Sequence, residues 1–75
     1  MYYLVKKMPA SPKIDFVSKS DTKNALIRQL PDLTVDAIAG LLNGEVYYDT
    51  VSAVKHKIVE EREYSQLIMA DTVIW

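Results

Sequence analysis

The chain carries strand-like apolar runs at both ends and apolar residues at helical spacing in its middle. Residues 1–8 open with aromatic and aliphatic side chains and have no helix cap before them, so they predict a strand. Pro9 and Pro12 then interrupt regular structure. Three apolar residues that follow are expected to anchor this segment to the core: Ile14, Phe16 and Val17.

Two helices are predicted next. The first follows the sequence Ser18–Asp21, which has the spacing of a capping box, and runs to Leu30. Pro31 ends it, because the residue before a proline avoids the helical region. The second helix begins after Thr34, whose hydroxyl group suits the N-cap, and ends before Gly44, which suits the left-handed position after a helix.

A third helix is predicted from Val51 to Glu63, capped by Asp49 or Thr50. Its inward face and that of the second helix are expected to meet in one core of Ile38, Leu42, Val54 and Ile58. The tail, residues 64–75, is strand-like, and it forms a hairpin around Ala70-Asp71 or pairs with the N-terminal strand. The predicted fold is therefore α+β, a small three-helix core with short flanking strands from both termini, in a single domain of residues 1–75.

Composition narrows the class of protein. The chain has 75 residues and no cysteine, so neither disulfides nor thiolate metal sites supplement its small core, and we expect a cytoplasmic protein without membrane association. The net charge of -1 argues against a dedicated non-specific nucleic-acid binder, which is normally strongly basic. A local basic face is compatible with this charge.

Two stretches, Leu33–Asn43 and Asp49–Val59, resemble the helix-turn-helix of winged-helix transcriptional regulators. The first resembles the family's Thr-capped second helix, and the second resembles its recognition helix, which opens with Thr50-Val51 and continues with apolar and basic residues. The tail stands where the family has its wing, although it lacks the basic, glycine-containing wing sequence, and the connection from Asn43 to Thr50 is longer than the family's tight turn. The resemblance implies a small DNA-binding transcription regulator.

The basic cluster Lys55, His56 and Lys57 lies where such a recognition helix would meet DNA, so we expect the first half of this helix to contact base edges and phosphates. Glu60, Glu61 and Glu63 follow closely and would repel a phosphate backbone running along the whole helix. The candidate nucleic-acid-binding residues are Ser52, Ala53, Lys55, His56, Lys57, Lys23 and Arg28.

The tyrosines support a second hypothesis, a protein-binding inhibitor or adaptor that docks on a larger machine such as RNA polymerase or a nuclease effector, as small phage and mobile-element proteins do. Two adjacent loop tyrosines cannot both point inward, and an exposed tyrosine suits a protein contact. The candidate protein-contact residues are Tyr2, Tyr3, Tyr47 and Tyr48.

Catalytic chemistry has no visible basis in the sequence. His56 and Glu60 are one helical turn apart in the predicted helix, but no third or fourth metal ligand accompanies them. The only glycines, Gly40 and Gly44, form neither a nucleophile elbow nor a phosphate-binding loop. We therefore expect no enzyme activity, metal, cofactor or small-molecule substrate, and a partner that is either DNA or a larger protein.

Overall fold

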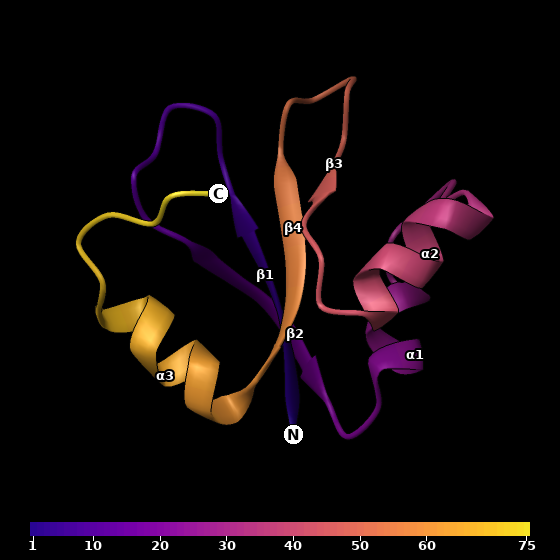
Figure 1. The fold of residues 1–75 in the computed structure, drawn as a ribbon, viewed down its shortest axis with the longest axis horizontal. Coiled ribbons are helices and arrows are strands. Elements are labelled where there is room, and N and C mark those ends of the chain that lie inside the picture. The colour runs from indigo at the N-terminus through magenta and orange to yellow at the C-terminus, as the bar shows by residue number, and fades with distance from the viewer.

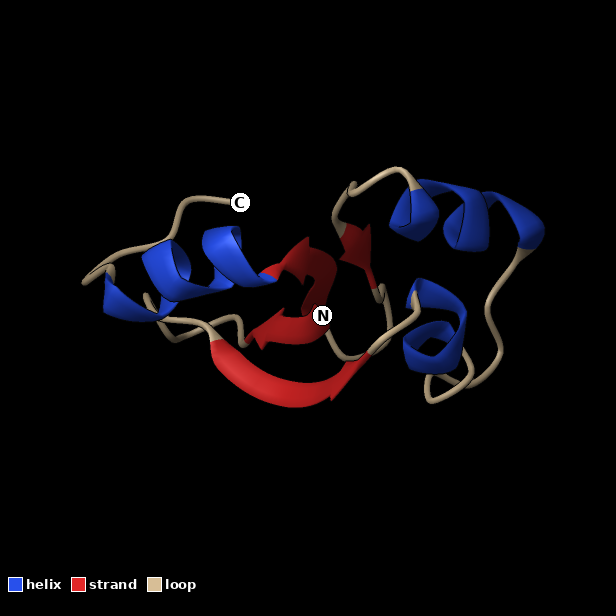
Figure 2. Ribbon diagram, turned by 90° about the horizontal axis from the view of Figure 1, so that it is seen from below, coloured by secondary structure: helices blue, strands red, loops and turns tan.

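The computed structural model describes residues 1–75 and shows a four-stranded antiparallel sheet with helices on both of its faces (Figures 1 and 2). The strands lie in the order β2-β1-β4-β3. The strands are β1 (Tyr2–Lys7), β2 (Asp15–Ser20), β3 (Tyr47–Tyr48) and β4 (Lys55–Glu60), and the helices are α1 (Lys23–Ile27), α2 (Val35–Leu42) and α3 (Glu61–Met69). None of these helices is long and apolar enough to cross a bilayer.

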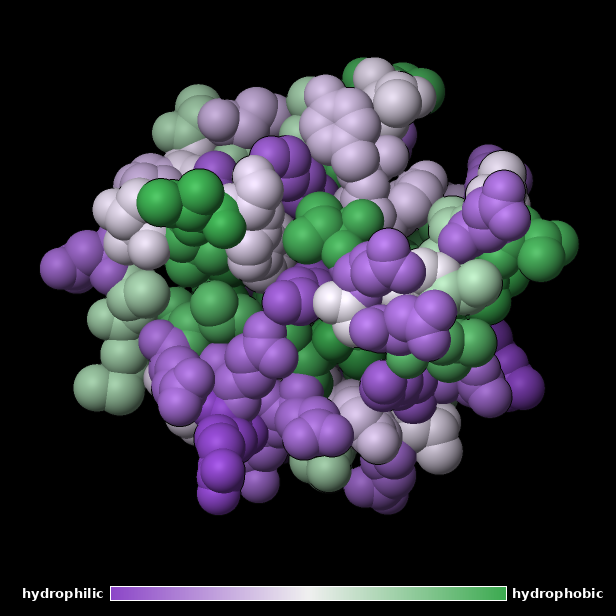
Figure 3. Space-filling view, viewed as in Figure 1, coloured by the Kyte–Doolittle hydropathy of each residue, from purple (hydrophilic) through white to green (hydrophobic).

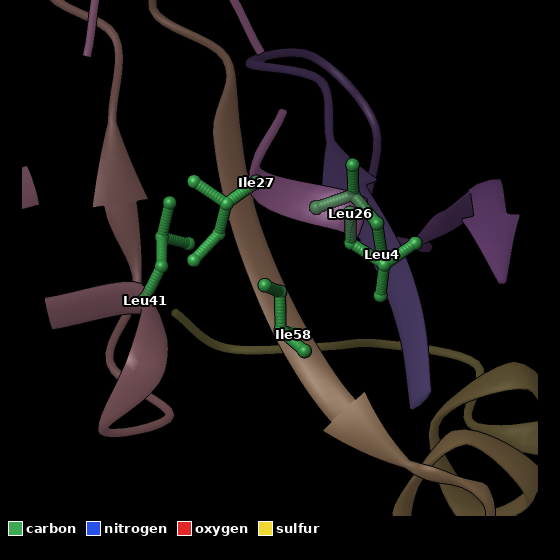
Figure 4. Close-up of a cluster of buried hydrophobic side chains, with 5 residues drawn as sticks. All are labelled: Leu4, Leu26, Ile27, Leu41 and Ile58. Atoms are coloured by element: carbon green, nitrogen blue, oxygen red, sulfur yellow. The ribbon is translucent and has the colours of Figure 1, made fainter. Parts of the chain in front are cut away.

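Both faces of the sheet are covered because the two central strands place buried side chains on alternate sides. Leu4 and Ile58 are directly opposite each other and face α1 and α2, whereas Val5 and Val59 face α3 and the C-terminal tail. We call these the α1/α2 face and the α3 face. Each face has a separate core cluster, and Figure 4 shows the one formed by Leu4, Leu26, Ile27, Leu41 and Ile58.

The two helices of the α1/α2 face are each capped by a threonine. The Thr34 hydroxyl accepts a hydrogen bond from the Ala37 amide at 3.1 Å, which confirms the predicted N-cap of α2. Thr22 caps α1 in the same way, one residue after the predicted capping segment. Gly44 follows α2 with a φ of 79°, the left-handed conformation that favours glycine after a helix.

The predicted three-helix core is wrong, because the expected third helix does not form. Residues 51–53 form the turn of a hairpin, residues 55–60 are β4, and only from Glu61 onward is the chain helical. Val54 and Ile58 are four residues apart, a spacing that places side chains on one side of a helix and equally on one face of a strand. Pairing with β1 selects the strand, because it buries Ile58 and Val59 on opposite faces of the sheet.

Three further predictions about the core and tail are corrected. Residues 64–69, expected to be a strand, belong to α3, and residues 72–75 form an extended tail without strand pairing, so there is no hairpin or wing. Leu41 is fully buried in the core position expected for Leu42, which is 38% exposed. Of the predicted anchor residues only Ile14 is buried; the other two, Phe16 and Val17, lie exposed on β2.

Candidate binding surface at the lysine-rich end of the sheet

The predicted nucleic-acid-binding residues do not form one surface. Lys55 and Lys57 lie on the α3 face of β4, and His56 between them points to the opposite face. Ser52 and Ala53 lie in the turn before β4. The other two predicted residues, Lys23 and Arg28, are in and directly after α1, on the other side of the sheet from Lys55 and Lys57.

Lys23 makes two contacts within the protein. Its Nζ donates a hydrogen bond to the Leu42 carbonyl oxygen at 2.8 Å and lies 5.4 Å from the centroid of the Tyr2 ring. This lysine therefore joins α1 to the end of α2 and to β1.

Only one of the four predicted contact tyrosines is exposed. Tyr2 and Tyr47 pack against the core cluster of the α1/α2 face, and Tyr3 stacks on Tyr64 of α3. Tyr48 is 49% exposed. The structure thus separates the adjacent pair, with Tyr47 turned to the core and Tyr48 turned to solvent.

A row of three side chains crosses the sheet at the end where β1 finishes and β4 begins. Lys7 of β1 is directly opposite Lys55 of β4, which in turn is opposite Tyr48 of β3. Directly opposed residues of antiparallel strands share a face of the sheet, so all three side chains lie on the α3 face. We call Lys7, Lys55 and Tyr48 the Lys-Lys-Tyr row.

Lys7 is not among the residues predicted from the sequence, because it lies in the N-terminal strand, far along the chain from Lys55. Lys6 next to it also escaped notice, and it lies opposite His56 on the other face. No local pattern links these residues, since β1 and β4 are brought together only by the antiparallel pairing of the sheet. A hint was present in the sequence itself: two adjacent lysines that end an otherwise apolar strand.

Neither lysine of the row forms an ion pair with a carboxylate side chain. The single ion pair of the structure joins Lys57 Nζ to Glu63 Oε2 at 2.9 Å, further along the same face. Lys55 Nζ donates a hydrogen bond to the backbone oxygen of Trp75 at 2.6 Å. The opposed Lys7 and Lys55 place two positive charges next to each other. Like charges directly opposite each other in a sheet repel and destabilise it.

Charged side chains of both signs lie at the other end of the sheet. Glu60 ends β4 opposite Tyr2, and Glu61 accepts a hydrogen bond from the Tyr3 hydroxyl at 3.4 Å. Figure 3 shows strongly hydrophilic side chains, whatever the sign of their charge, at the bottom of the view, around the region where α3 begins in Figure 1. Lys19, Lys23 and Arg62 also lie at this end, and Asp15 and Asp49 lie at the lysine-rich end, so charges of both signs occur at both ends of the sheet.

A small pocket opens beside the Lys-Lys-Tyr row. Its volume is about 230 Å³, and it is lined by the row together with Met8, Pro9 and Ala53. Two lysines, one tyrosine and three apolar residues thus line one open pocket. A larger hollow of about 550 Å³ at the start of α3 is lined mostly by charged side chains and has no aromatic wall.

His56 lies behind the row, on the α1/α2 face. Its Nδ1 is buried and has no hydrogen-bond partner. Burial lowers the pKa of His56, and the nearby Lys6 lowers this pKa further, whereas Asp49 opposes both effects. The imidazole is consequently neutral at pH 7 and adds no positive charge to this end of the sheet.

Metal ligation has little geometric support. His56 and Glu60 are four residues apart in a strand and therefore roughly 13 Å apart along it, too far to share one ion. The structure contains no group of three or more histidine, cysteine or acidic side chains that could hold a metal.

Comparison with known proteins gives no match to a family model, to a curated protein or to a solved structure.

Proposed function

We propose that this protein is a small non-enzymatic regulatory protein of the cytoplasm that binds nucleic acid through the lysine-rich end of its sheet. The observation that carries the proposal is the directly opposed pair Lys7 and Lys55, which forms no ion pair with a carboxylate side chain and adjoins the exposed ring of Tyr48. A phosphate group between the two ammonium groups would relieve their repulsion.

The local pairing of two lysines in the row supports the same proposal. Phosphate neutralisation supplies most of the affinity of non-specific nucleic-acid binding, and it depends on the local surface more than on the net charge. The row contains only two lysines and one tyrosine, so the footprint should be only a few nucleotides. The proposal differs from the helix-turn-helix expectation, because Lys55 and Lys57 lie on a strand and not on a recognition helix.

The test is fluorescence anisotropy with labelled DNA at about 50 mM salt, a condition that strengthens phosphate contacts. The double variant Lys7→Ala/Lys55→Ala should lose binding. The control Lys19→Ala/Arg28→Ala removes the same charge from exposed positions outside the row and should bind as the parent does. Equal losses in the two double variants would show that only the total charge matters, and absence of binding in the parent would refute the proposal.

A second candidate function is the protein-binding inhibitor or adaptor, and the β3–β4 hairpin favours it. Val51 at the tip is 96% exposed, and its neighbours Tyr48 and Val46 are also exposed. Figure 3 shows apolar surface at the top of the view, where Figure 1 places this hairpin. The test is partner capture from lysate with the parent and with Val51→Ser, which changes no charge. Loss of one captured protein in Val51→Ser alone would support this function.

A further inference from the structure

We propose that the pocket beside the Lys-Lys-Tyr row takes a single unpaired nucleotide, so that the ligand is single-stranded nucleic acid. In this arrangement the base stacks on the Tyr48 ring and a neighbouring phosphate contacts the ammonium groups of Lys7 and Lys55. The inference rests on the proposed function, because it names the class of nucleic acid that the same surface would bind.

The chemistry of the pocket walls points to a nucleotide. Tyr48 offers a half-exposed aromatic ring, and Met8 and Pro9 offer apolar surface on the β1 side. The two lysines supply the positive charge at the same opening. Single-stranded binding proteins combine these two elements, since aromatic rings stack on unpaired bases while basic side chains follow the backbone.

The size of the pocket limits what can enter. A volume of about 230 Å³ lies below the ~300–1,000 Å³ range of pockets that enclose whole drug-sized ligands. One nucleotide of a longer chain fits this limit better than a complete dinucleotide cofactor, because the remainder of the chain stays outside.

Duplex DNA is less compatible with this end of the molecule. No helix is available at this end, where the β1–β2 connection and the β3–β4 hairpin project (Figure 1). A two-stranded ribbon can enter the major groove, but residues 46–54 contain no lysine or arginine. They contain Asp49, whose pKa is lowered chiefly by a hydrogen bond from the Val51 amide, so a negative charge stands at the base of the hairpin. Stacking on Tyr48 also requires a base that is free of its partner strand.

The C-terminal tail borders the same surface. Val73 is buried against the α3 face, and its amide donates to the Pro12 carbonyl oxygen at 2.7 Å. This contact holds the tail near Lys55, whose only hydrogen-bond acceptor is the backbone oxygen of Trp75. A phosphate would therefore compete with that oxygen for Lys55, whereas Lys7 has no such competitor.

The experiment compares three fluorescent probes at about 50 mM salt: a 12-nucleotide oligothymidine, a DNA hairpin with a 12-base-pair stem, and a glutamate-rich peptide. Oligothymidine should bind more tightly than the duplex, with a shallow salt slope near the −0.7 expected for about one phosphate contact on a single strand. Tyr48→Leu should weaken oligothymidine binding by about five-fold or more, and Tyr48→Phe, which keeps the ring, should bind within about two-fold of the parent. Thermal unfolding of both variants checks that the fold is intact.

The outcomes separate this inference from the proposed function. The single-strand inference is wrong if the duplex binds as tightly as oligothymidine or more tightly. It is also wrong if Tyr48→Leu binds oligothymidine as the parent does while Lys7→Gln loses binding. In both cases the proposal of nucleic-acid binding still holds. Absence of binding to both nucleic-acid probes would overturn both proposals. Binding of the glutamate-rich peptide alone would assign the row to an acidic protein partner. If Tyr48→Leu unfolds, the variant Lys7→Gln tests the inference in its place. A single-strand site requires Lys7→Gln to weaken the binding of oligothymidine more than the binding of the duplex.

Discussion

Tyr3 of β1 and Tyr64 of α3 stack face to face, with ring centroids 4.1 Å apart and ring planes only 3° apart. Phe16 of β2 meets both rings edge-on. Helix α3 has no fully buried residue, and its N-cap makes no side-chain hydrogen bond. The aromatic stack is therefore one of the few contacts that fix α3 against the sheet.

The first prediction concerns this stack. Tyr64→Ala should lower the free energy of unfolding by about 2 kcal/mol, because a half-buried ring and its stacking partner lose their contact. Ile68→Ala on the same helix, at a position 45% exposed, should cost less than about 0.5 kcal/mol. Chemical denaturation measures both. Similar losses in the two variants would mean that α3 is not held by the tyrosine stack.

The second prediction distinguishes two adjacent leucines of α2. Leu41 is fully buried in the core of the α1/α2 face, and Leu42 is 38% exposed. Leu41→Ala should cost ~2–5 kcal/mol of stability, whereas Leu42→Ala should cost less than about 1 kcal/mol. The pair is its own control, since the substitutions are chemically identical. The reverse order in urea denaturation would contradict the helix orientation described here.

The third prediction concerns the turn before β4. Ala53 has a φ of 62°, in the left-handed region that costs a residue with a Cβ roughly 1–2 kcal/mol. Ala53→Gly should therefore stabilise the protein by about 0.5–1 kcal/mol after the extra chain entropy of glycine is subtracted. Ala39→Gly inside α2 should do the opposite and destabilise by about 1 kcal/mol. A lower melting temperature for Ala53→Gly would argue against the left-handed turn.

The fourth prediction is a pH dependence that originates at His56. Because burial and Lys6 lower the pKa of His56 in the folded protein, the unfolded chain binds a proton here more readily. The contribution of His56 to the free energy of unfolding is therefore fully present above the pKa of the unfolded state, about 6.5. This contribution is lost as the pH falls through the lower pKa of His56 in the folded state.

The measurement is the free energy of unfolding between about pH 7.5 and pH 5.5, a range in which histidine is the main side chain to titrate. His56→Leu removes the imidazole and should flatten this dependence. Asp49→Asn removes the nearby carboxylate that favours the protonated form, and it should steepen the loss at low pH. An unchanged slope in His56→Leu would assign the dependence to another group.

Local signals in the sequence were sufficient for some elements. The N-terminal strand needs only its run of aromatic and aliphatic residues and the prolines that follow it. The second helix needs only the hydroxyl group of Thr34 at its start and the freedom of Gly44 after its end. These features act within a few residues, so they are readable without knowledge of the rest of the fold.

The tertiary structure decided the remainder, and residues 54–69 show why. The spacing of Val54 and Ile58 fits a helix and a strand equally. The strand forms because its pairing with β1 buries both Ile58 and Val59. In α3, Tyr64 finds its packing partner on β1, so its helical form depends on contacts that no local pattern reveals. The same is true of the candidate site: Lys7 and Lys55 become neighbours only when the sheet pairs them, because antiparallel hydrogen bonding joins residues regardless of their distance along the chain.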